Sequence, residues 1–164
     1  MTFVPDFMFS SVYDITPEFF KENGITSIVS DIDNTLVTYD DEKPTKHLLK
    51  WLEELNECGI SVSFVSNNSH ERVRIFNEEL GFFAVGKSGK PFKKNVLRAL
   101  EKMNAEKKNA CIIGDQVFTD VLAGRNAGIR TVLVPPIKDK TDVFTKFKRV
   151  LEKPILKAYK KRHM

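Results

Sequence analysis

Short apolar runs alternate along the chain with segments that are amphipathic at helical spacing. The runs are rich in β-branched and aromatic residues, which is typical of strands. Their nearly continuous apolar character is expected of strands that are covered on both faces. The runs predict five strands, at residues 25–30, 60–65, 82–85, 110–113 and 130–134.

The segments between these strands have the features of helices. One predicted helix begins near Pro44 and ends at Gly59, with an apolar face made of Leu48, Leu49, Leu52 and Leu55. Thr16 as N-cap and Pro17 at the first helical position predict an earlier helix that ends at Gly24. Further helices are indicated by Val73, Phe76 and Leu80, by Val96, Leu100 and Met103, and by residues 121–127 before Gly128.

Strands that alternate with helices across short connections favour parallel βαβ units with right-handed crossovers. The expected fold is therefore α/β, a three-layer, Rossmann-like domain with a parallel central sheet of about five strands. A chain of 164 residues suits one such domain.

The composition is that of a globular protein, with 41% hydrophobic and 29% charged residues. No apolar run reaches the roughly 18–20 residues that span a bilayer. The apolar start is too short for a signal peptide and is interrupted by Pro5 and Asp6. We therefore expect a cytoplasmic protein. Two cysteines, Cys58 and Cys111, are too few for a disulfide framework and show no metal-ligand spacing.

Positive charge is concentrated at the end of the chain. Residues 144–164 hold eight lysines or arginines and one glutamate, whereas the whole chain has 26 bases and 22 acids. We therefore divide the chain into a domain at 1–140 and a basic helical tail at 141–164, in which Pro154 predicts a kink or two short helices. Apolar residues recur along the tail at Phe144, Phe147, Leu151, Ile155 and Tyr159. This basic amphipathic pattern predicts either peripheral contact with an anionic membrane, at its inner surface, or packing on the domain.

Polar residues that could carry chemistry follow four of the expected strands. In strand order they are Asp31 and Asp33, Ser66 and Asn67, Lys90, and Asp115. In an open parallel sheet, ligands bind beyond the carboxyl ends of the strands. The four groups are therefore expected to meet at one edge of the sheet.

The acidic residues predict a metal site. Asp31 and Asp33 are two residues apart in extended chain, so we expect their carboxylates to converge. Close anions repel unless a cation lies between them, and Asp115 would add a third carboxylate. Oxygen ligands favour Mg²⁺, which keeps a substrate phosphate in its shell. Lys90 would neutralise that phosphate and keep Asp31 ionised as a nucleophile.

Two further features support a phosphate site. Ser66 and its neighbours lead into the N-terminus of the next helix, where backbone N–H groups bind anions. Asp120 is expected to position Lys90, or a metal-bound water, rather than to bind the ion itself.

Four motifs resemble those of the haloacid dehalogenase superfamily of phosphohydrolases. They are Asp31-Ile-Asp33-Asn-Thr35, Ser66-Asn67, Lys90-Pro91 and Gly114-Asp115-Gln-Val-Phe-Thr119-Asp120. The closer resemblance is to the YqeG-like branch of subfamily IIIA, which is related to mitochondrial phosphatidylglycerophosphate phosphatases. Residues 12–17 and 119–124 carry this closer resemblance.

The resemblance implies a phosphatase in which Asp31 attacks phosphorus and forms an aspartyl phosphate. Asp33 would first protonate the leaving group and then activate water. Mg²⁺ would be held by Asp31, the backbone carbonyl of Asp33, and Asp115. The other motif residues would bind the phosphate or support those that do: Ser66, Asn67, Lys90, Thr119 and Asp120.

Many members of this superfamily have a cap domain inserted after the first or second motif. Here residues 36–65 hold one helix and one strand, and residues 68–89 likewise, so we expect no cap. An open site favours a large or surface-borne substrate, or an oligomer whose neighbour covers the cleft. The resemblance and the tail favour phosphatidylglycerophosphate as substrate; a sugar, nucleotide or protein phosphate is the alternative.

Two other classes of protein remain as alternatives. A receiver-type phosphoacceptor module also uses clustered acids and a lysine, but it needs no acid at the position of Asp33. A non-catalytic module could bind an anionic surface, RNA or membrane, through the tail alone. No feature of the sequence predicts specific binding of a nucleic acid.

Overall fold

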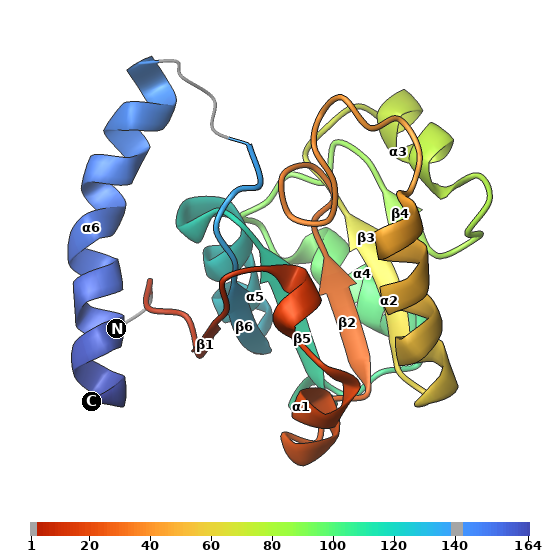
Figure 1. The fold of residues 1–164 in the computed structure, drawn as a ribbon, viewed down its shortest axis with the longest axis horizontal. Helices are drawn as coiled ribbons and strands as arrows, with labels where there is room; N and C mark the ends of the chain where they lie inside the picture. Colours follow the sequence, from red (N-terminus) through yellow and green to blue (C-terminus); the bar gives the residue numbers. More distant parts are fainter. Residues whose placement is uncertain (1–2, 139–142) are drawn as a thin grey trace.

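The computed structural model describes residues 3–138 and 143–164, without the side chains of residues 144 and 145. Within these residues six strands form one parallel sheet in the order β1-β6-β5-β2-β3-β4 (Figure 1). The strands are β1 (Phe7–Met8), β2 (Ser27–Ser30), β3 (Ser61–Val65), β4 (Ala84–Val85), β5 (Ala110–Gly114) and β6 (Arg130–Leu133).

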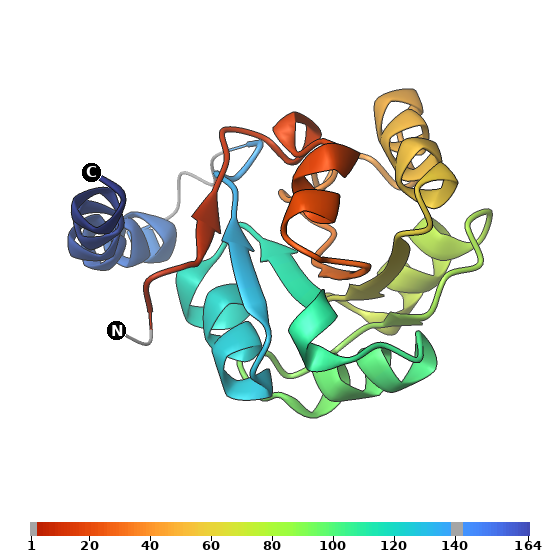
Figure 2. The ribbon, with the colours of Figure 1, turned by 90° about the horizontal axis from the view of Figure 1, so that it is seen from below.

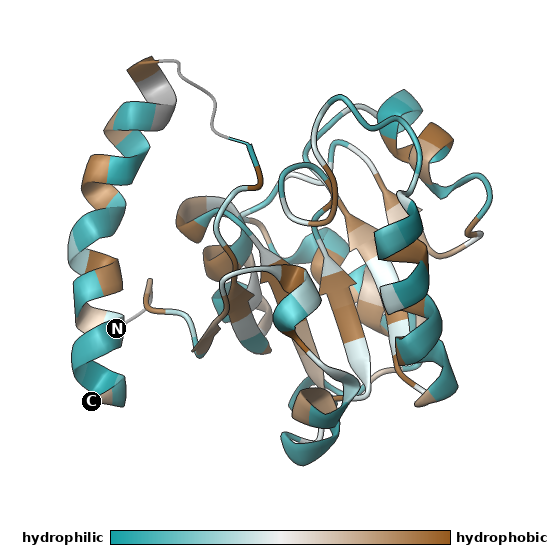
Figure 3. Cartoon of the chain, in the orientation of Figure 1, coloured by the Kyte–Doolittle hydropathy of each residue, from teal (hydrophilic) through white to brown (hydrophobic). Residues whose placement is uncertain are grey.

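Helices cover both faces of the sheet. They are α1 (Pro17–Glu22), α2 (Lys46–Glu57), α3 (His70–Asn77), α4 (Lys94–Lys102), α5 (Leu122–Ala127) and α6 (Val143–His163). Helices α1 and α2 lie on one face, and α4 and α5 on the other (Figure 2). Successive strand residues point to opposite cores, as Ile28 and Val29 of β2 do. Apolar strands lie between helices with polar outer faces (Figure 3), which confirms the three-layer α/β fold.

Side-chain caps determine where three of the helices begin. The N-caps Thr16, Thr45 and Ser69 each accept a hydrogen bond from the backbone N–H three residues later. Helix α2 therefore begins at Lys46, two residues beyond Pro44, where the sequence predicted its start. Helix α5 ends where Gly128 adopts the left-handed conformation, with φ of 76°.

Strand β1 extends the sheet beyond the five expected strands. Only two residues, Phe7–Met8, pair with β6, so the strand is too short to show a periodicity. Asp6 anchors the segment, because one carboxylate oxygen accepts a hydrogen bond from the Thr131 N–H at 2.9 Å and the other pairs with Arg125 at 2.9 Å. The sixth strand thus depends on a side-chain anchor rather than on a hydrophobic pattern.

Some elements differ in detail from their sequence-based boundaries. Strand β4 keeps only the last two of its four expected residues. Helix α3 ends at Asn77 rather than near Gly81, because the Asn77 side chain binds both backbone groups of Phe82. Leu49 was expected on the buried face of α2 but is 41% exposed. A turn of about 100° per residue carries it away from the face that holds Leu48.

The basic tail forms one helix, α6, with Pro154 inside it, rather than the two short helices that were one of the two expectations. Pro154 lies on the exposed side of the helix, where its missing N–H disturbs no packing against the domain. Ile155, which is 8% exposed, packs in a small core with Val4, Val117, Val121 and Leu133. The Tyr159 hydroxyl accepts a hydrogen bond from the Met8 N–H at 3.1 Å.

The amphipathic residues of the tail have two different environments. Ile155 and Tyr159 pack against the sheet edge, whereas Phe147 is 60% and Leu151 is 46% exposed. The Phe144 side chain and the expected boundary between residues 140 and 141 lie outside the described residues. None of the described helices is long and apolar enough to cross a bilayer.

The expected absence of a cap domain is confirmed for the described residues. The chain between β2 and β3 makes a loop and α2, and between β3 and β4 it makes α3. The carboxyl edge of the sheet therefore has no inserted domain above it in this part of the chain.

Gly124 lets α5 approach the sheet closely. A Cβ added there would lie 2.4 Å from Ile112 Cγ2 and 2.6 Å from Thr131 Cγ2. We expect Gly124→Ala to lower the free energy of unfolding by about 1–3 kcal/mol, because the helix must move away from β5 and β6. Urea denaturation followed by circular dichroism measures this. Lys102→Ala, an exposed change on α4, is the control, and an equal effect of the two changes would contradict the close packing.

Candidate active site

Strands β2 and β5 lie side by side, and the chain continues from them in opposite directions. From β2 it passes to β3 and β4 on one side, and from β5 it passes to β6 on the other. Such a switch point is where open parallel sheets bind ligands. Asp31 directly follows β2 and Asp115 directly follows β5, so both acids leave the sheet at this point.

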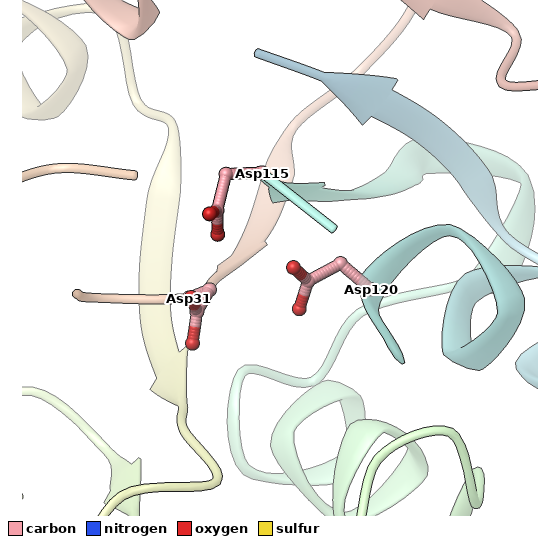
Figure 4. A group of neighbouring side chains, drawn as sticks. All are labelled: Asp31, Asp115 and Asp120. Atoms are coloured by element: carbon pink, nitrogen blue, oxygen red, sulfur yellow. The ribbon is translucent and has the colours of Figure 1, made fainter. Parts of the chain in front are cut away.

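Asp31, Asp115 and Asp120 form an acidic cluster at this edge of the sheet. Each offers one carboxylate oxygen, and these atoms all lie within 4.8 Å of one another. The three carboxyl groups face a common space (Figure 4), two from strand ends and that of Asp120 from the helical turn Val117–Val121. All three are at most 9% exposed. Among the described residues, the spacing of this group fits a metal ion.

Lys90 is the basic partner of the acidic cluster. Its Nζ lies 2.9 Å from Asp31 Oδ1 and 2.6 Å from Asp120 Oδ1, and the side chain is 2% exposed. Burial acts to lower the pKa of Lys90, but the charges of Asp120 and Asp31 outweigh it, and the pKa is raised. The ammonium therefore stays charged and fixes the Asp31 carboxylate in place.

One ammonium does not balance three carboxylates. Burial raises the pKa of Asp31 to about 6, although Lys90 acts against the shift. Burial, together with repulsion from Asp120 and Asp31, raises the pKa of Asp115 to about 8. The Thr35 hydroxyl, 3.1 Å from Asp115 Oδ1, opposes this only in part. A further positive charge would relieve the repulsion, so this donor set fits a divalent cation.

The Asp33 carboxylate is directed away from the acidic cluster. Its Oδ1 accepts hydrogen bonds from Arg72 Nε and Nη2, at 3.1 and 2.9 Å, and its Oδ2 accepts one from Asn68 Nδ2 at 2.9 Å. Asp31 and Asp33 line one pocket, but Asp33 is not one of the three acids whose oxygens lie within 4.8 Å of one another. Asp31 meets the acids that follow β5 because β2 and β5 are paired side by side.

The residues after β3 hold the loop that carries the lysine. Asn67 Oδ1 accepts hydrogen bonds from the Lys90 N–H at 2.9 Å and the Ser88 hydroxyl at 2.8 Å. Asn67 Nδ2 donates to the Lys90 carbonyl at 3.0 Å. The Ser66 hydroxyl accepts a hydrogen bond from the Asn68 N–H at 3.1 Å, just before α3 begins. Asn67 thus fixes the backbone of Lys90 as well as facing the site.

Most of the site residues named from the sequence share one pocket. Its lining includes Asp31, Asp33, Ser66, Asn67, Lys90 and Thr119. Asp115 lines an adjoining pocket, and Asp120 is buried beneath Lys90. The structure therefore brings all eight residues to one edge of the sheet, with Asp33 facing a partner that the sequence did not reveal.

Five residues of the site were missed by sequence reasoning, one of them Asn68, which lines the pocket and donates a hydrogen bond to Asp33. Arg72 binds Asp33, and Tyr39, Gln116 and Lys148 line the pocket. Gln116 lies inside the last motif, and Arg72 is a base in the first turn of the helix that follows Ser66-Asn67, so both positions carried a usable signal. The positions of Tyr39 and Lys148 depend on a loop and on the docking of α6, which leave no local pattern.

Comparisons with known proteins match two adjoining parts of the chain. A family described as haloacid dehalogenase-like hydrolase matches residues 28–90, and a HAD-hydrolase-like family matches residues 87–146. A protein of Bacillus subtilis described as the probable phosphatase YqeG is 41% identical over 160 residues. That alignment covers 98% of this chain and 93% of the relative.

Solved structures support the same fold. An uncharacterised protein from Listeria monocytogenes is similar with a TM-score of 0.56 and 18% identity, covering 79% of this chain and 99% of that one. The cobalt-bound deoxy-D-mannose-octulosonate 8-phosphate phosphatase of Haemophilus influenzae is similar with a TM-score of 0.55 and 15% identity. The alignment covers 85% of this chain and 91% of that one. Together with the near full-length relative, these findings show that the chain belongs to the haloacid dehalogenase superfamily of hydrolases, among its phosphatases.

Proposed function

We propose that this phosphatase hydrolyses phosphomonoesters with the help of Mg²⁺ and through an aspartyl phosphate on Asp31. The observation that carries the proposal is the position of the Asp31 carboxylate, which lines the pocket and is fixed by Lys90 at 2.9 Å. A fixed carboxylate beside a buried ammonium can attack a phosphorus whose charge the ammonium helps to neutralise.

Asp31 and Asp115 would hold the metal ion, with the backbone carbonyl of Asp33 as a further oxygen ligand. When bound, a divalent cation would neutralise charge on the transferring phosphoryl group. Asp120 is within reach of the same space, but its Oδ1 is paired with Lys90 and its Oδ2 accepts a hydrogen bond from the Gln116 N–H at 3.1 Å. These contacts support a positioning role for Asp120.

The first half of the reaction forms the covalent intermediate. An oxygen of Asp31 attacks phosphorus while the bond from phosphorus to the leaving oxygen breaks, and Asp33 gives its proton to that oxygen. Both oxygens of Asp33 accept hydrogen bonds here, from Arg72 and Asn68. Proton donation therefore requires that the leaving oxygen replaces one of these partners.

The second half of the reaction regenerates the enzyme. Asp33 takes a proton from water, the water oxygen attacks phosphorus, and the bond from phosphorus to Asp31 breaks to release inorganic phosphate. Arg72 stabilises Asp33 when it carries negative charge, which suits this step. Ser66 and the N-terminal N–H groups of α3 would hold the phosphate oxygens meanwhile.

A phospholipid head group, such as that of phosphatidylglycerophosphate, is the substrate that we propose. Two observations support it: no cap covers the carboxyl edge in the described residues, and Lys148 of the basic helix α6 lines the pocket. The same helix exposes apolar side chains, since Val143 is 84%, Phe147 is 60% and Val150 is 59% exposed. A basic helix with exposed apolar residues is suited to peripheral contact with an anionic membrane.

Asp31→Asn should lower the rate of phosphate release by about a thousandfold or more, because the amide is not a nucleophile. Release is measured with Mg²⁺ and with a chelator, on a panel of phosphatidylglycerophosphate, sugar phosphates, nucleotides and a phosphopeptide. The panel also identifies the substrate class.

Asp14→Asn, an exposed change far from the acidic cluster in sequence and outside the pocket lining, is the matched control. Full activity of Asp31→Asn would contradict the role of Asp31 as nucleophile. Phosphate release by the wild type that the chelator does not change would contradict the role of Mg²⁺.

Asp115→Asn should stabilise the metal-free protein. The ordinary carboxyl pKa of 3.8 is raised to about 8 in the folded chain, so the stability of the wild type falls as pH rises through this range. Asparagine does not ionise, so the variant does not lose this stability as the pH rises. We expect its free energy of unfolding to exceed that of the wild type by at least about 1 kcal/mol at pH 8 and by much less at pH 4.

Urea denaturation at the two pH values measures the difference. Addition of Mg²⁺ should stabilise the wild type more than the variant, because the variant lacks one ligand. A variant that is less stable than the wild type at pH 8 without metal would contradict the electrostatic account of the cluster.

Helix α6 should bind vesicles that contain phosphatidylglycerol more strongly than phosphatidylcholine vesicles, and salt should weaken the binding. Sedimentation with vesicles measures this for the wild type and for Phe147→Ser. Phe92→Ser removes a phenylalanine that is more exposed, at 75%, and lies outside α6, and it serves as control. We expect loss of binding only for Phe147→Ser; wild-type protein that stays unbound at low salt would refute membrane contact.

A further inference from the structure

Gln116 lies where the active-site pocket and the adjoining pocket meet. It lines both of them, the pocket that holds Asp31 and the pocket that holds Asp115. In the chain it directly follows Asp115, which itself comes after the end of β5. A phosphomonoester whose phosphate reaches Asp31 therefore has Gln116 beside any part of it that extends into the adjoining pocket.

The backbone of Gln116 is held on both sides by the helical turn that follows it. Its N–H donates a hydrogen bond to Asp120 Oδ2 at 3.1 Å. Its carbonyl accepts hydrogen bonds from the Asp120 N–H at 2.9 Å and the Val121 N–H at 3.3 Å. Asp120 is in turn paired with the buried ammonium of Lys90. The Gln116 side chain therefore starts from a defined place in the site.

Two donors determine which way the side-chain amide of Gln116 faces. Its Oε1 accepts a hydrogen bond from Lys148 Nζ at 3.4 Å and one from the Thr119 hydroxyl at 3.4 Å. An ammonium can only donate, so the amide atom that faces Lys148 must be the oxygen and not the nitrogen. The nitrogen, Nε2, is therefore directed away from these two donors.

The Nε2 of Gln116 is a hydrogen-bond donor that the protein itself does not use. Within residues 3–138 and 143–164, the hydrogen bonds of the Gln116 side chain are those to Oε1, and no group accepts one from Nε2. The buried side-chain atoms without a partner in this part of the chain are Ser63 Oγ and Arg125 Nε, so Nε2 is not sealed from solvent. An amide nitrogen has two N–H donors and no charge, and it therefore suits a neutral acceptor oxygen.

We propose that Gln116 is a specificity determinant whose Nε2 donates a hydrogen bond to a hydroxyl oxygen on the leaving group of the phosphomonoester. The inference rests on the proposed function, because it assigns a contact to the part of the same substrate that lies beyond the phosphate. Phosphomonoesters of polyols would gain this contact, and simple alkyl phosphates would lack it. Gln116 takes no part in the chemical step.

Two pairs of soluble compounds isolate the hydroxyl group. Hydroxyethyl phosphate is paired with propyl phosphate, and hydroxypropyl phosphate with butyl phosphate, so that a methyl group replaces the terminal hydroxyl in each pair. The ratio of kcat/KM for the hydroxyl compound to that for its alkyl partner is compared between variants, which cancels differences in intrinsic reactivity. Gln116→Met keeps a side chain of similar length without a donor. We expect it to lower this ratio about fivefold in at least one pair, as the loss of a neutral hydrogen bond does.

The control is Asn56→Met, which removes an exposed side-chain amide on α2 outside both pocket linings and should leave the ratios unchanged. Gln116→Leu repeats the test with a different apolar side chain and should give the same decrease as Gln116→Met. A loss of kcat/KM that is equal for the two members of each pair would assign Gln116 to the phosphate and overturn the inference. Unchanged kcat/KM values for all four compounds would overturn it as well.

A binding measurement separates this inference from the proposed function. Calorimetry with Asp31→Asn gives the Kd of each compound without turnover, in the presence and absence of Gln116→Met. A preference for the hydroxyl compounds that Gln116→Met lowers supports the contact even where the wild type releases no phosphate, a result that would refute only the catalytic proposal. Ratios of Kd that are the same with and without Gln116→Met overturn the contact whatever the activity.

A hydroxyl near a phosphomonoester occurs on lipid head groups as well as on soluble compounds. A third arm therefore presents phosphatidylglycerophosphate in phosphatidylcholine vesicles, beside a counterpart whose head group lacks the free glycerol hydroxyl. A ratio of their kcat/KM values that falls in Gln116→Met supports the contact with a lipid source. A fall confined to the soluble pairs supports it with a soluble source, and a fall in neither set overturns it.

Discussion

The buried contact of Lys90 with Asp31 and Asp120 is the interaction on which the site depends. It joins three segments that are far apart in the chain, namely the end of β2, the loop after β4 and the helical turn after β5. An ammonium that is 2% exposed is stable only with such partners, because an unpaired buried charge is costly. The same contact leaves the three acids with surplus negative charge, so the fold accepts electrostatic repulsion where the chemistry takes place.

Much of this arrangement could be predicted from the sequence, for a physical reason. Parallel strands end at one edge, so polar residues that follow successive strands must meet there, and Asp31, Lys90 and Asp115 do. The partner of Asp33 could not be predicted in this way, because Arg72 comes from a helix, α3, and not from the residues that directly follow a strand. Strand β1 was not predicted, because the Asp6 side chain, and not a periodic hydrophobic pattern, holds it in the sheet.

The tail illustrates a different limit of sequence reasoning. Its amphipathic pattern fitted both membrane contact and packing, and the structure shows buried residues such as Ile155 next to exposed ones such as Phe147. Hydrophobic spacing identifies the apolar face of a helix but not the surface that covers each part of it. The place of Lys148 and Arg149 follows only from the docking of α6, which brings them beside Asn34 and Tyr39, loop residues more than a hundred positions earlier in the chain.

The place of α6 in the chain has an evolutionary consequence. In the proposed reaction the groups that handle the phosphate come from the sheet and its loops, whereas Lys148, which lines the same pocket, comes from the last helix. The proposed reactive groups and this part of the pocket wall are thus encoded in separate stretches of the gene. Recombination or drift confined to the final codons could redirect such an enzyme to a new ester while its reactive machinery is inherited intact.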